Sequence, residues 1–296
     1  MDLKSVVNKL DIEFAIKDLP PDEPFSTLLP KKYGEAGILF NQYFTAEYLI
    51  NFHGLMLKNS DQVNKIYLSV FLSPEILDKI FLRQTGEALI FIHHPMEFES
   101  SGRGFLPLPE KYFIEMQKRK ISVYSIHTPL DIHGRISTSR SIAKLLELQS
   151  PQEYSRCSTG FAGIFGQLED KMPFDEFIAL LKIIFNLSKI TYKQELPFVQ
   201  KIGIIAGGGA EVEYMKETIS LGCDTYLSGD YLNKVQTINS KHHRAEYEAI
   251  KDELKINLIE CSHYATEKVV LENEMQDYFQ NLGLLTEYID QADYWK

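Results

Sequence analysis

Residues 65–94 read KIYLSVFLSPEILDKIFLRQTGEALIFIHH and contain the pattern of a strand, a helix and a second strand. The β-rich run 65–71 predicts the first strand, and Ser73-Pro74 supplies a helix N-cap followed by proline in the first turn. We expect that helix to run to Gly86, and the apolar run 88–92 predicts a buried strand. A strand–helix–strand unit of this kind is typical of α/β proteins with parallel sheets.

The same alternation continues along the chain. Further strands are expected at 121–126, 161–168, 201–206, 224–228 and 256–260, and further helices at 109–118, 139–148, 174–186, 210–221, 243–254 and 267–282. Two such cycles, joined near residues 149–151, predict an α/β fold with two lobes and mostly parallel sheets. The predicted parts are an N-terminal extension (1–35), a first lobe (36–150), a second lobe (151–255) and a C-terminal segment that returns to the first lobe (256–296). Because the extension carries four prolines, we expect it to wrap over the surface.

Composition excludes several classes of protein. The 296 residues include 31 Lys+Arg and 41 Asp+Glu, and this net charge of −10 disfavours sequence-independent binding to nucleic acid. The N-terminus has no signal-peptide pattern, and apolar runs such as 88–92 are far shorter than the ~20 residues of a membrane span. The three cysteines, Cys157, Cys223 and Cys261, are too widely spaced for a disulfide framework. We therefore expect a cytoplasmic protein that does not bind membranes.

Four of the eight histidines follow predicted strands. These are His93 and His94 after strand 88–92, His127 after strand 121–126, and His263 shortly after strand 256–260. Open α/β sheets bind ligands beyond the carboxyl ends of their strands. A carboxylate stands four residues after two of these histidines, at Asp131 and at Glu267. On a helix this spacing puts both groups on one face, but Pro129 instead predicts a shaped loop at the first pair.

Imidazoles and carboxylates are the ligands that zinc, iron and manganese prefer. Six such groups exceed the three protein ligands of one catalytic metal and suit two ions that share a water or carboxylate. Taken alone, a His-His pair at a strand end is more often a surface feature, and a His-x-x-x-Glu pair is often an exposed helix pair. The coincidence of three such elements, each after a predicted strand, favours metal binding.

Other features leave alternatives open. The glycine run 207–209 follows a strand, but it lacks phosphate-binding spacing, and the acidic residues in 211–213 would repel a phosphate, which favours a tight turn. Asp230 either faces the site or caps a helix, and His243 either lines the site or is solvated. Cys261 is either a soft metal ligand or, more commonly for cysteine, a small buried hydrophobe.

In combination, several motifs resemble those of the NGG-interacting-factor-three-like family, whose members are also known as GTP cyclohydrolase I type-two homologues or dinuclear-metal-centre proteins. The matching segments are IFIHHPMEF (90–98), HTPLD (127–131), IIAGGGA (204–210), CDTYLSGD (223–230), KHHRAEYEAIK (241–251) and SHYATE (262–267). They occur in the family's order and cover roughly residues 40–280. The polar insertion 231–241 departs from the family's pattern, and the extension 1–35 is outside the resemblance.

The resemblance implies a two-lobed α/β subunit, a site for two metal ions in the cleft between the lobes, and a ring-like homohexamer. Carried over residue by residue, the metal ligands fall on the set that the strand ends also predict: His93, His94, His127, Asp131, His263 and Glu267. Asp131 and Glu267 are the candidates for a bridging ligand.

The resemblance also implies a metal-dependent hydrolase similar to GTP cyclohydrolases, with a metal-bridged hydroxide as nucleophile and a nucleotide as substrate. Asp230 and His243 are then the candidates for proton transfer. The alternative is a non-catalytic metal-binding protein that acts as a regulatory or interaction assembly. Structural and catalytic metals differ in open coordination positions, which a sequence does not show.

Overall fold

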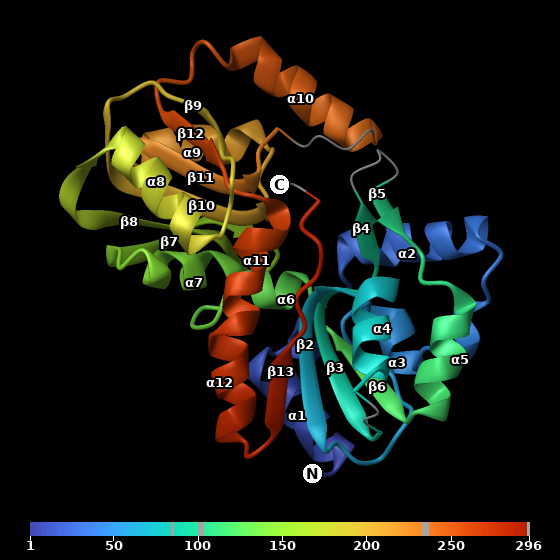
Figure 1. Ribbon diagram of the computed structural model, residues 1–296. Coiled ribbons are helices and arrows are strands. Elements are labelled where there is room, and N and C mark those ends of the chain that lie inside the picture. Colours follow the sequence, from blue (N-terminus) through green and yellow to red (C-terminus); the bar gives the residue numbers. More distant parts are fainter. Residues whose placement is uncertain (84–85, 100–103, 233–236, 295–296) are drawn as a thin grey trace. The chain divides into compact units, whose positions relative to one another are not determined.

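A computed structural model describes residues 1–83, 86–99, 104–232 and 237–294 (Figure 1). The chain divides into two compact units. Unit 1 is formed by the described parts of 1–99, 105–130 and 271–292, and unit 2 by those of 100–104, 131–270 and 293–296. Strands and helices alternate in both, so the predicted α/β class is confirmed.

Unit 1 contains a five-stranded sheet in the order β1-β6-β3-β2-β13. Its strands are β1 (Gly54–Leu57), β2 (Lys65–Phe71), β3 (Ala88–His94), β6 (Ile121–Ser125) and β13 (Leu285–Tyr288). Neighbouring strands pair in parallel except β1, which runs antiparallel to β6. A separate two-stranded ladder joins β4 (Glu97–Glu99) and β5 (Gly104–Leu106).

Helices of unit 1 lie on both faces of this sheet. They are α1 (Leu3–Glu13), α2 (Glu23–Glu35), α3 (Ala46–Asn51), α4 (Pro74–Phe81), α5 (Glu110–Lys118) and α12 (Glu274–Asn281), with short 3₁₀ helices η1 (Ile16–Asp18) and η2 (Phe40–Gln42). Strand β3 explains this arrangement. Ile90 and Ile92 are buried in a core cluster that includes residues of α4 and α5, whereas Phe91 contacts Phe279 of α12. A strand buried on both faces reads as a continuous apolar run, which is why it was predictable.

The N-terminal residues differ from the expected surface extension. Residues 1–35 form α1, η1 and α2, and Phe25, Leu29 and Tyr33 of α2 are fully or almost fully buried in the core of unit 1. Pro24 lies in the first turn of α2, where proline has no hydrogen bond to lose. Pro24 therefore marks the start of a helix, whereas Pro30 lies inside α2.

Unit 2 contains a six-stranded mixed sheet in the order β7-β8-β10-β11-β12-β9. Its strands are β7 (Gln149–Cys157), β8 (Gly160–Pro173), β9 (Thr191–Lys193), β10 (Phe198–Gly208), β11 (Thr225–Asp230) and β12 (Asn257–Glu260). The central strands β10, β11 and β12 are parallel, and the outer pairs are antiparallel.

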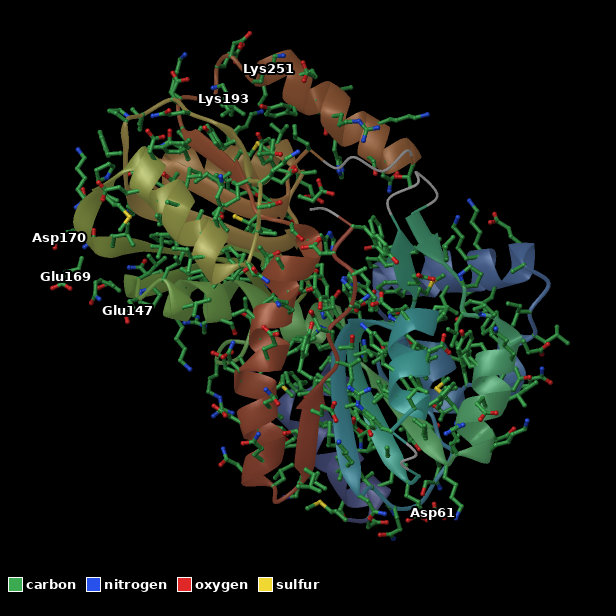
Figure 2. The ribbon with its side chains drawn as sticks, in the orientation of Figure 1. Asp61, Glu147, Glu169, Asp170, Lys193 and Lys251 are labelled. Carbon is green, nitrogen blue, oxygen red and sulfur yellow. The ribbon has the colours of Figure 1, made fainter. Side chains whose placement is uncertain are left out.

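The helices of unit 2 are α7 (Thr138–Leu145), α8 (Phe174–Ile184), α9 (Val212–Ser220) and α10 (Ile238–Ile250). Two further helices, α6 (Thr128–Asp131) and α11 (His263–Glu272), each contain residues of both units. Helix α7 and strand β12, which we expected in the first lobe and the C-terminal segment, lie in unit 2. Figure 2 shows Glu147, Glu169 and Asp170 on the surface of unit 2, where their side chains are exposed.

Among the described residues, every helix is too short or too polar to cross a lipid bilayer.

The role of α2 in the core can be tested by two matched substitutions. Leu29→Ala removes a side chain that is completely buried, and we expect it to lower the free energy of unfolding by about 2–5 kcal/mol. Leu39→Ala removes the same atoms from a side chain that is 73% exposed, and its effect should be within about 0.5 kcal/mol. Urea denaturation measures both. Equal effects would contradict the placement of α2 in the core.

Candidate metal centre

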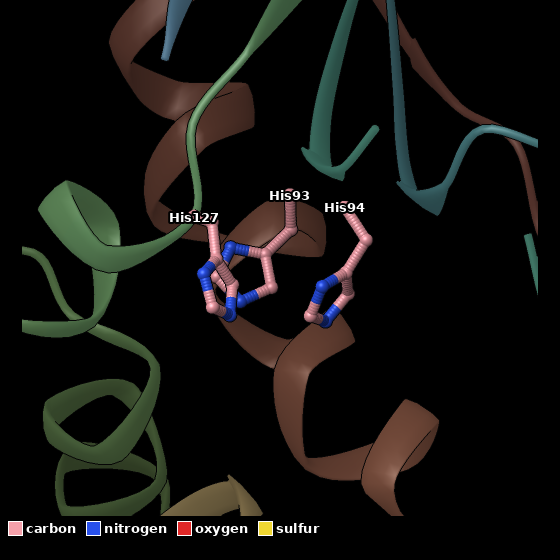
Figure 3. A group of neighbouring side chains, drawn as sticks. All are labelled: His93, His94 and His127. Carbon is pink, nitrogen blue, oxygen red and sulfur yellow. The ribbon is translucent and has the colours of Figure 1, made fainter. Parts of the chain in front are cut away.

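Parallel pairing of β3 with β6 brings three histidines to one edge of the sheet in unit 1. The register pairs Ala88 with Ile121 and Ile92 with Ser125, so the residues that follow Ser125 run beside the last two residues of β3. His93 and His94 are the last two residues of β3, and His127 follows β6 with one residue between. Figure 3 shows the three imidazole rings converging beyond the strand ends.

The three rings are packed closely. Their centroids are 4.4 Å apart for His93 and His94, 5.1 Å for His93 and His127, and 4.9 Å for His94 and His127. One ring nitrogen of each histidine lies within 4.8 Å of the corresponding atoms of the other two. His93 and His94 are buried and His127 is half-buried. Buried imidazoles crowded in this way suit a shared cation, because neutral imidazole nitrogen is a preferred ligand of transition metals.

Hydrogen bonds fix the tautomer of two of these rings. Nδ1 of His93 lies 2.9 Å from the carbonyl oxygen of Ile126, and Nδ1 of His127 lies 3.0 Å from Oδ2 of Asp22. Because both partners are acceptors, each Nδ1 carries a hydrogen, and in the neutral ring the lone pair is on Nε2. Metal-binding histidines commonly donate their second nitrogen in this way.

Asp22 is a site residue that we did not predict from the sequence. It is the N-cap of α2, and its side chain is completely buried against His127. Burial alone would raise the pKa of its carboxyl group, but attraction by His127 and hydrogen bonds from His127, Thr128 and Phe25 lower that pKa well below its usual range. Asp22 is therefore ionised at neutral pH. Its only signal in the sequence is a helix cap followed by Glu-Pro, which predicts a helix start and no histidine contact.

Aromatic rings enclose the three histidines within unit 1. Phe71 stacks on His94 at a centroid distance of 4.6 Å, and Phe105 lies 5.6 Å from the same imidazole. Phe25 meets His127 edge-on at 5.0 Å. Apolar surroundings of this kind reduce the local dielectric constant, which strengthens electrostatic interactions at the imidazoles.

Unit 2 carries the other predicted pair, His263 and Glu267. His263 is the first residue of α11, and the helix brings Oε1 of Glu267 to 3.0 Å from its Nε2. The four-residue spacing thus places both groups on one helix face, as expected. Glu267 is 4% exposed, and burying a carboxylate is costly without a partner of opposite charge or hydrogen-bond donors.

The start of α11 is held in a constrained conformation. Ser262 has φ of 95°, which is rare for a residue other than glycine. Its N–H donates to Gly229 O, its hydroxyl donates to Asp293, and that hydroxyl accepts from Ala265 N–H as a helix cap. These contacts hold His263, the next residue, in a fixed position within unit 2.

The glycine run allows α11 to pack closely against the sheet of unit 2. Gly207 has φ of 65°, and its N–H donates to Thr266 Oγ1 at 3.0 Å. A Cβ atom at Gly207 would overlap Oε1 of Glu267, and one at Gly229 would lie 2.5 Å from Thr266 Oγ1. The predicted tight turn is wrong for most of the run, because Gly207 and Gly208 end β10, where its pairing with β11 is irregular. The close approach of the backbone is present, and at Gly207 it is to Glu267 of α11.

Asp131 is the last residue of α6 and accepts a hydrogen bond from Thr138 Oγ1 at 2.8 Å. We expected a shaped loop at 127–131 because of Pro129, but the structure has one helical turn. The reason is that Pro129 is in the first turn of α6, where proline is tolerated.

Asp230 and His243 are both in unit 2. Asp230 ends β11 and is 3% exposed, and the N-cap of α10 is Thr237, so Asp230 does not cap that helix. His243 is half-buried on α10 and interacts electrostatically with Glu211, whose pKa is raised by burial. By contrast, His242 is 68% exposed.

Two further expectations concern residues near these groups. Cys261 is 1% exposed in an apolar core cluster, so its interpretation as a buried hydrophobe is confirmed. Part of the insertion 231–241, residues 233–236, lies outside the described residues. Helix α10 begins within the insertion, at Ile238, and not at the expected residue 243.

The close approach at Gly207 can be tested against a second glycine. Gly207→Ala and Gly222→Ala both force a side chain into positive φ, which costs about 1–2 kcal/mol. At Gly222 the nearest atom to an added Cβ is Lys201 Nζ at 3.9 Å, whereas at Gly207 the Glu267 carboxylate must move. We expect Gly207→Ala to be the more destabilising in chemical denaturation. Equal losses of stability would contradict the close packing of the Glu267 carboxylate against Gly207.

Comparison with known proteins gives relatives with a common name. The chain is 24% identical over 233 residues to the "GTP cyclohydrolase 1 type 2 homolog" of Haemophilus influenzae, covering 78% of this chain and 86% of the relative. It is 25% identical over 243 residues to the protein of the same name from Pyrococcus horikoshii, covering 80% and 88%.

Solved structures share the fold. Reduced HcgD from Methanocaldococcus jannaschii matches with a TM-score of 0.65 and 21% identity over 98% of both chains. A protein from Thermus thermophilus matches with a TM-score of 0.66 and 17% identity over 99% of both chains. The family description Duf34/NIF3 (NGG1p interacting factor 3) matches residues 45–290, which is most of the sequence. This chain therefore belongs to the Duf34/NIF3 family.

Proposed function

We propose that this protein binds two divalent metal ions and acts as a metal-dependent hydrolase. The observation that carries the proposal is the group of three histidines in unit 1, each with a ring nitrogen within 4.8 Å of the others. In two of them the Nδ1 hydrogen bond leaves Nε2 as the basic nitrogen. Three imidazoles arranged in this way are a donor set suited to zinc, iron or manganese.

The proposed ligand set is the one predicted from the sequence. It consists of His93, His94, His127, Asp131, His263 and Glu267. The orientation of two carboxylates in unit 2 supports this ligand set. Asp131 accepts a hydrogen bond from Thr138, and Glu267 packs against Gly207 with its carboxylate beside His263. Six donors are enough for two ions with about three protein ligands each, which leaves coordination positions for water and substrate.

The proposed substrate is a purine nucleotide, with GTP as the first candidate because relatives bear the name GTP cyclohydrolase 1 type 2 homolog. Bound divalent ions supply an activated water and stabilise developing negative charge. Asp230 and His243 are the proposed groups for proton transfer, and Arg244 or Lys241 is the proposed contact for the triphosphate. A cytoplasmic homohexamer is the proposed assembly.

Metal content tests the ligand set directly. We expect about two ions per protomer in the untagged protein by plasma mass spectrometry, and almost none in the double variant His94→Ala, His263→Ala. His242→Ala removes an imidazole that is 68% exposed and should leave the metal content unchanged. If the wild-type protein takes up no zinc, iron or manganese after reloading, the ligand assignment is wrong.

Turnover separates the hydrolase from an interaction assembly. Metal-loaded protein should convert GTP, and removal of the metal or the substitution His94→Ala should lower the rate by more than about 100-fold. Loss of the hydrogen-bond partner of a metal ligand usually lowers activity about 10–100-fold, and loss of the ligand itself should lower it further. His242→Ala is again the control. Full metal occupancy without turnover of nucleotides or esters would contradict the hydrolase proposal and favour a metal-binding regulatory or interaction protein.

A further inference from the structure

The Asp22 carboxylate makes more contacts than a helix cap requires. Oδ1 accepts the N–H of Phe25 at 3.2 Å, which is the capping interaction. Oδ2 accepts the N–H of Thr128 at 3.2 Å and Nδ1–H of His127 at 3.0 Å. Thr128 and His127 lie more than 100 residues further along the chain. Asp22 therefore joins the start of α2 to the segment that carries a predicted metal ligand.

A second aspartate provides an internal comparison. Asp2 is the N-cap of α1, where it accepts the N–H of Ser5 at 2.8 Å and the Ser5 hydroxyl at 3.0 Å. Asp2 is exposed, whereas Asp22 is 2% exposed. Capping alone thus needs neither burial nor contact with a histidine. Burying a carboxylate costs free energy, so the position of Asp22 requires the additional donors that it meets.

The backbone around Asp22 is also fixed. Its N–H donates to the carbonyl oxygen of Asn51 at 2.9 Å, and its own carbonyl accepts from Ser26 N–H at 2.8 Å. Three residues further on, Phe25 packs edge-on against His127. The imidazole is therefore held by a charged hydrogen bond at Nδ1 and by an aromatic ring, both from the first turn of α2.

This geometry has two consequences for His127. Because the Asp22 carboxylate accepts a hydrogen bond from Nδ1–H, the hydrogen of the neutral ring stays on Nδ1 and Nε2 is the basic nitrogen. The negative charge of Asp22 beside the ring also offsets the charge of a cation bound there. Aromatic side chains around the three histidines strengthen that charge interaction by excluding water.

We propose that Asp22 is a positioning residue of the metal centre, which orients His127 and supplies a balancing negative charge. The inference rests on the proposed function. It extends that function to residues 1–35, which precede the region that matches the family. The N-terminal segment is then part of the site as well as part of the core.

Two variants of Asp22 and one of Asp2 test the proposal. Asp22→Ser retains an oxygen able to cap α2 but removes the carboxylate beside His127. Asp22→Asn preserves the size of the side chain but removes its charge, and it serves if the serine variant does not fold. Asp2→Ser changes an N-cap that has no histidine partner. Zinc affinity is measured by competition with a chelator, alongside urea denaturation of the metal-free proteins.

We expect Asp22→Ser to weaken zinc binding about 10–100-fold, Asp22→Asn to weaken it less, and Asp2→Ser to leave it unchanged. The second readout is the ¹⁵N signature of the histidine rings in metal-free protein. His127 should appear as the Nδ1–H tautomer in wild type and as a mixture of tautomers in Asp22→Ser. A merely structural cap would change stability without changing that signature.

Two results would overturn the inference, and they are distinguishable. If the wild type binds zinc and both Asp22 variants bind it equally tightly, with the same His127 tautomer, Asp22 has no positioning role. If the wild type binds no zinc, iron or manganese, the proposed function fails and this inference fails with it.

Discussion

The parallel register of β3 against β6 is the constraint on which the candidate site depends. Because Ile92 pairs with Ser125, the residues after Ser125 run beside the end of β3, and Ile126 N–H continues the ladder to the carbonyl oxygen of Ile92. His93 then lies beside the backbone of Ile126, whose carbonyl oxygen accepts its Nδ1–H. A shift of β3 by one residue would reverse the faces of His93 and His94 relative to His127. The apolar strands thus specify the site as well as the core.

Much of the fold was predictable because the central strands are buried on both faces. The runs at 65–71, 88–92, 121–126 and 201–206 are mainly apolar, and each coincides with most or part of a strand. Edge strands were missed for the opposite reason. Strand β7 reads QSPQEYSRC and is exposed over most of its length, and β13 has only four residues. Their strand conformation depends on pairing with a neighbour, which local sequence does not encode.

Helix ends show a similar limit. The helix expected at 267–282 is two helices, α11 and α12, which are separated at Asn273. Helix α11 begins at His263, four residues earlier than expected, because its start is set by the Ser262 turn and its contacts with Gly229 and Asp293. These contacts come from distant parts of the sequence, so no local pattern reveals them.

The same distinction applies to the candidate site. His93, His94, His127 and His263 were predicted because each follows a strand, and Glu267 was predicted from its four-residue spacing from His263. Asp22 was not found, since its local pattern describes a helix cap and its contact with His127 spans 105 residues. Spacing predicts neighbours along one element, whereas the hydrogen-bond partner of a ligand is supplied by tertiary structure.

Helix α2 has one more consequence, for the local unfolding of unit 1. The same first turn carries Asp22, which contacts His127, and Phe25, which is part of the core. Any opening of this turn releases both contacts in one event, so the alignment of His127 and the local stability of residues 22–25 are thermodynamically linked. By reciprocity, a ligand that binds the aligned imidazole must slow amide hydrogen exchange at the start of α2, although those amides do not touch it.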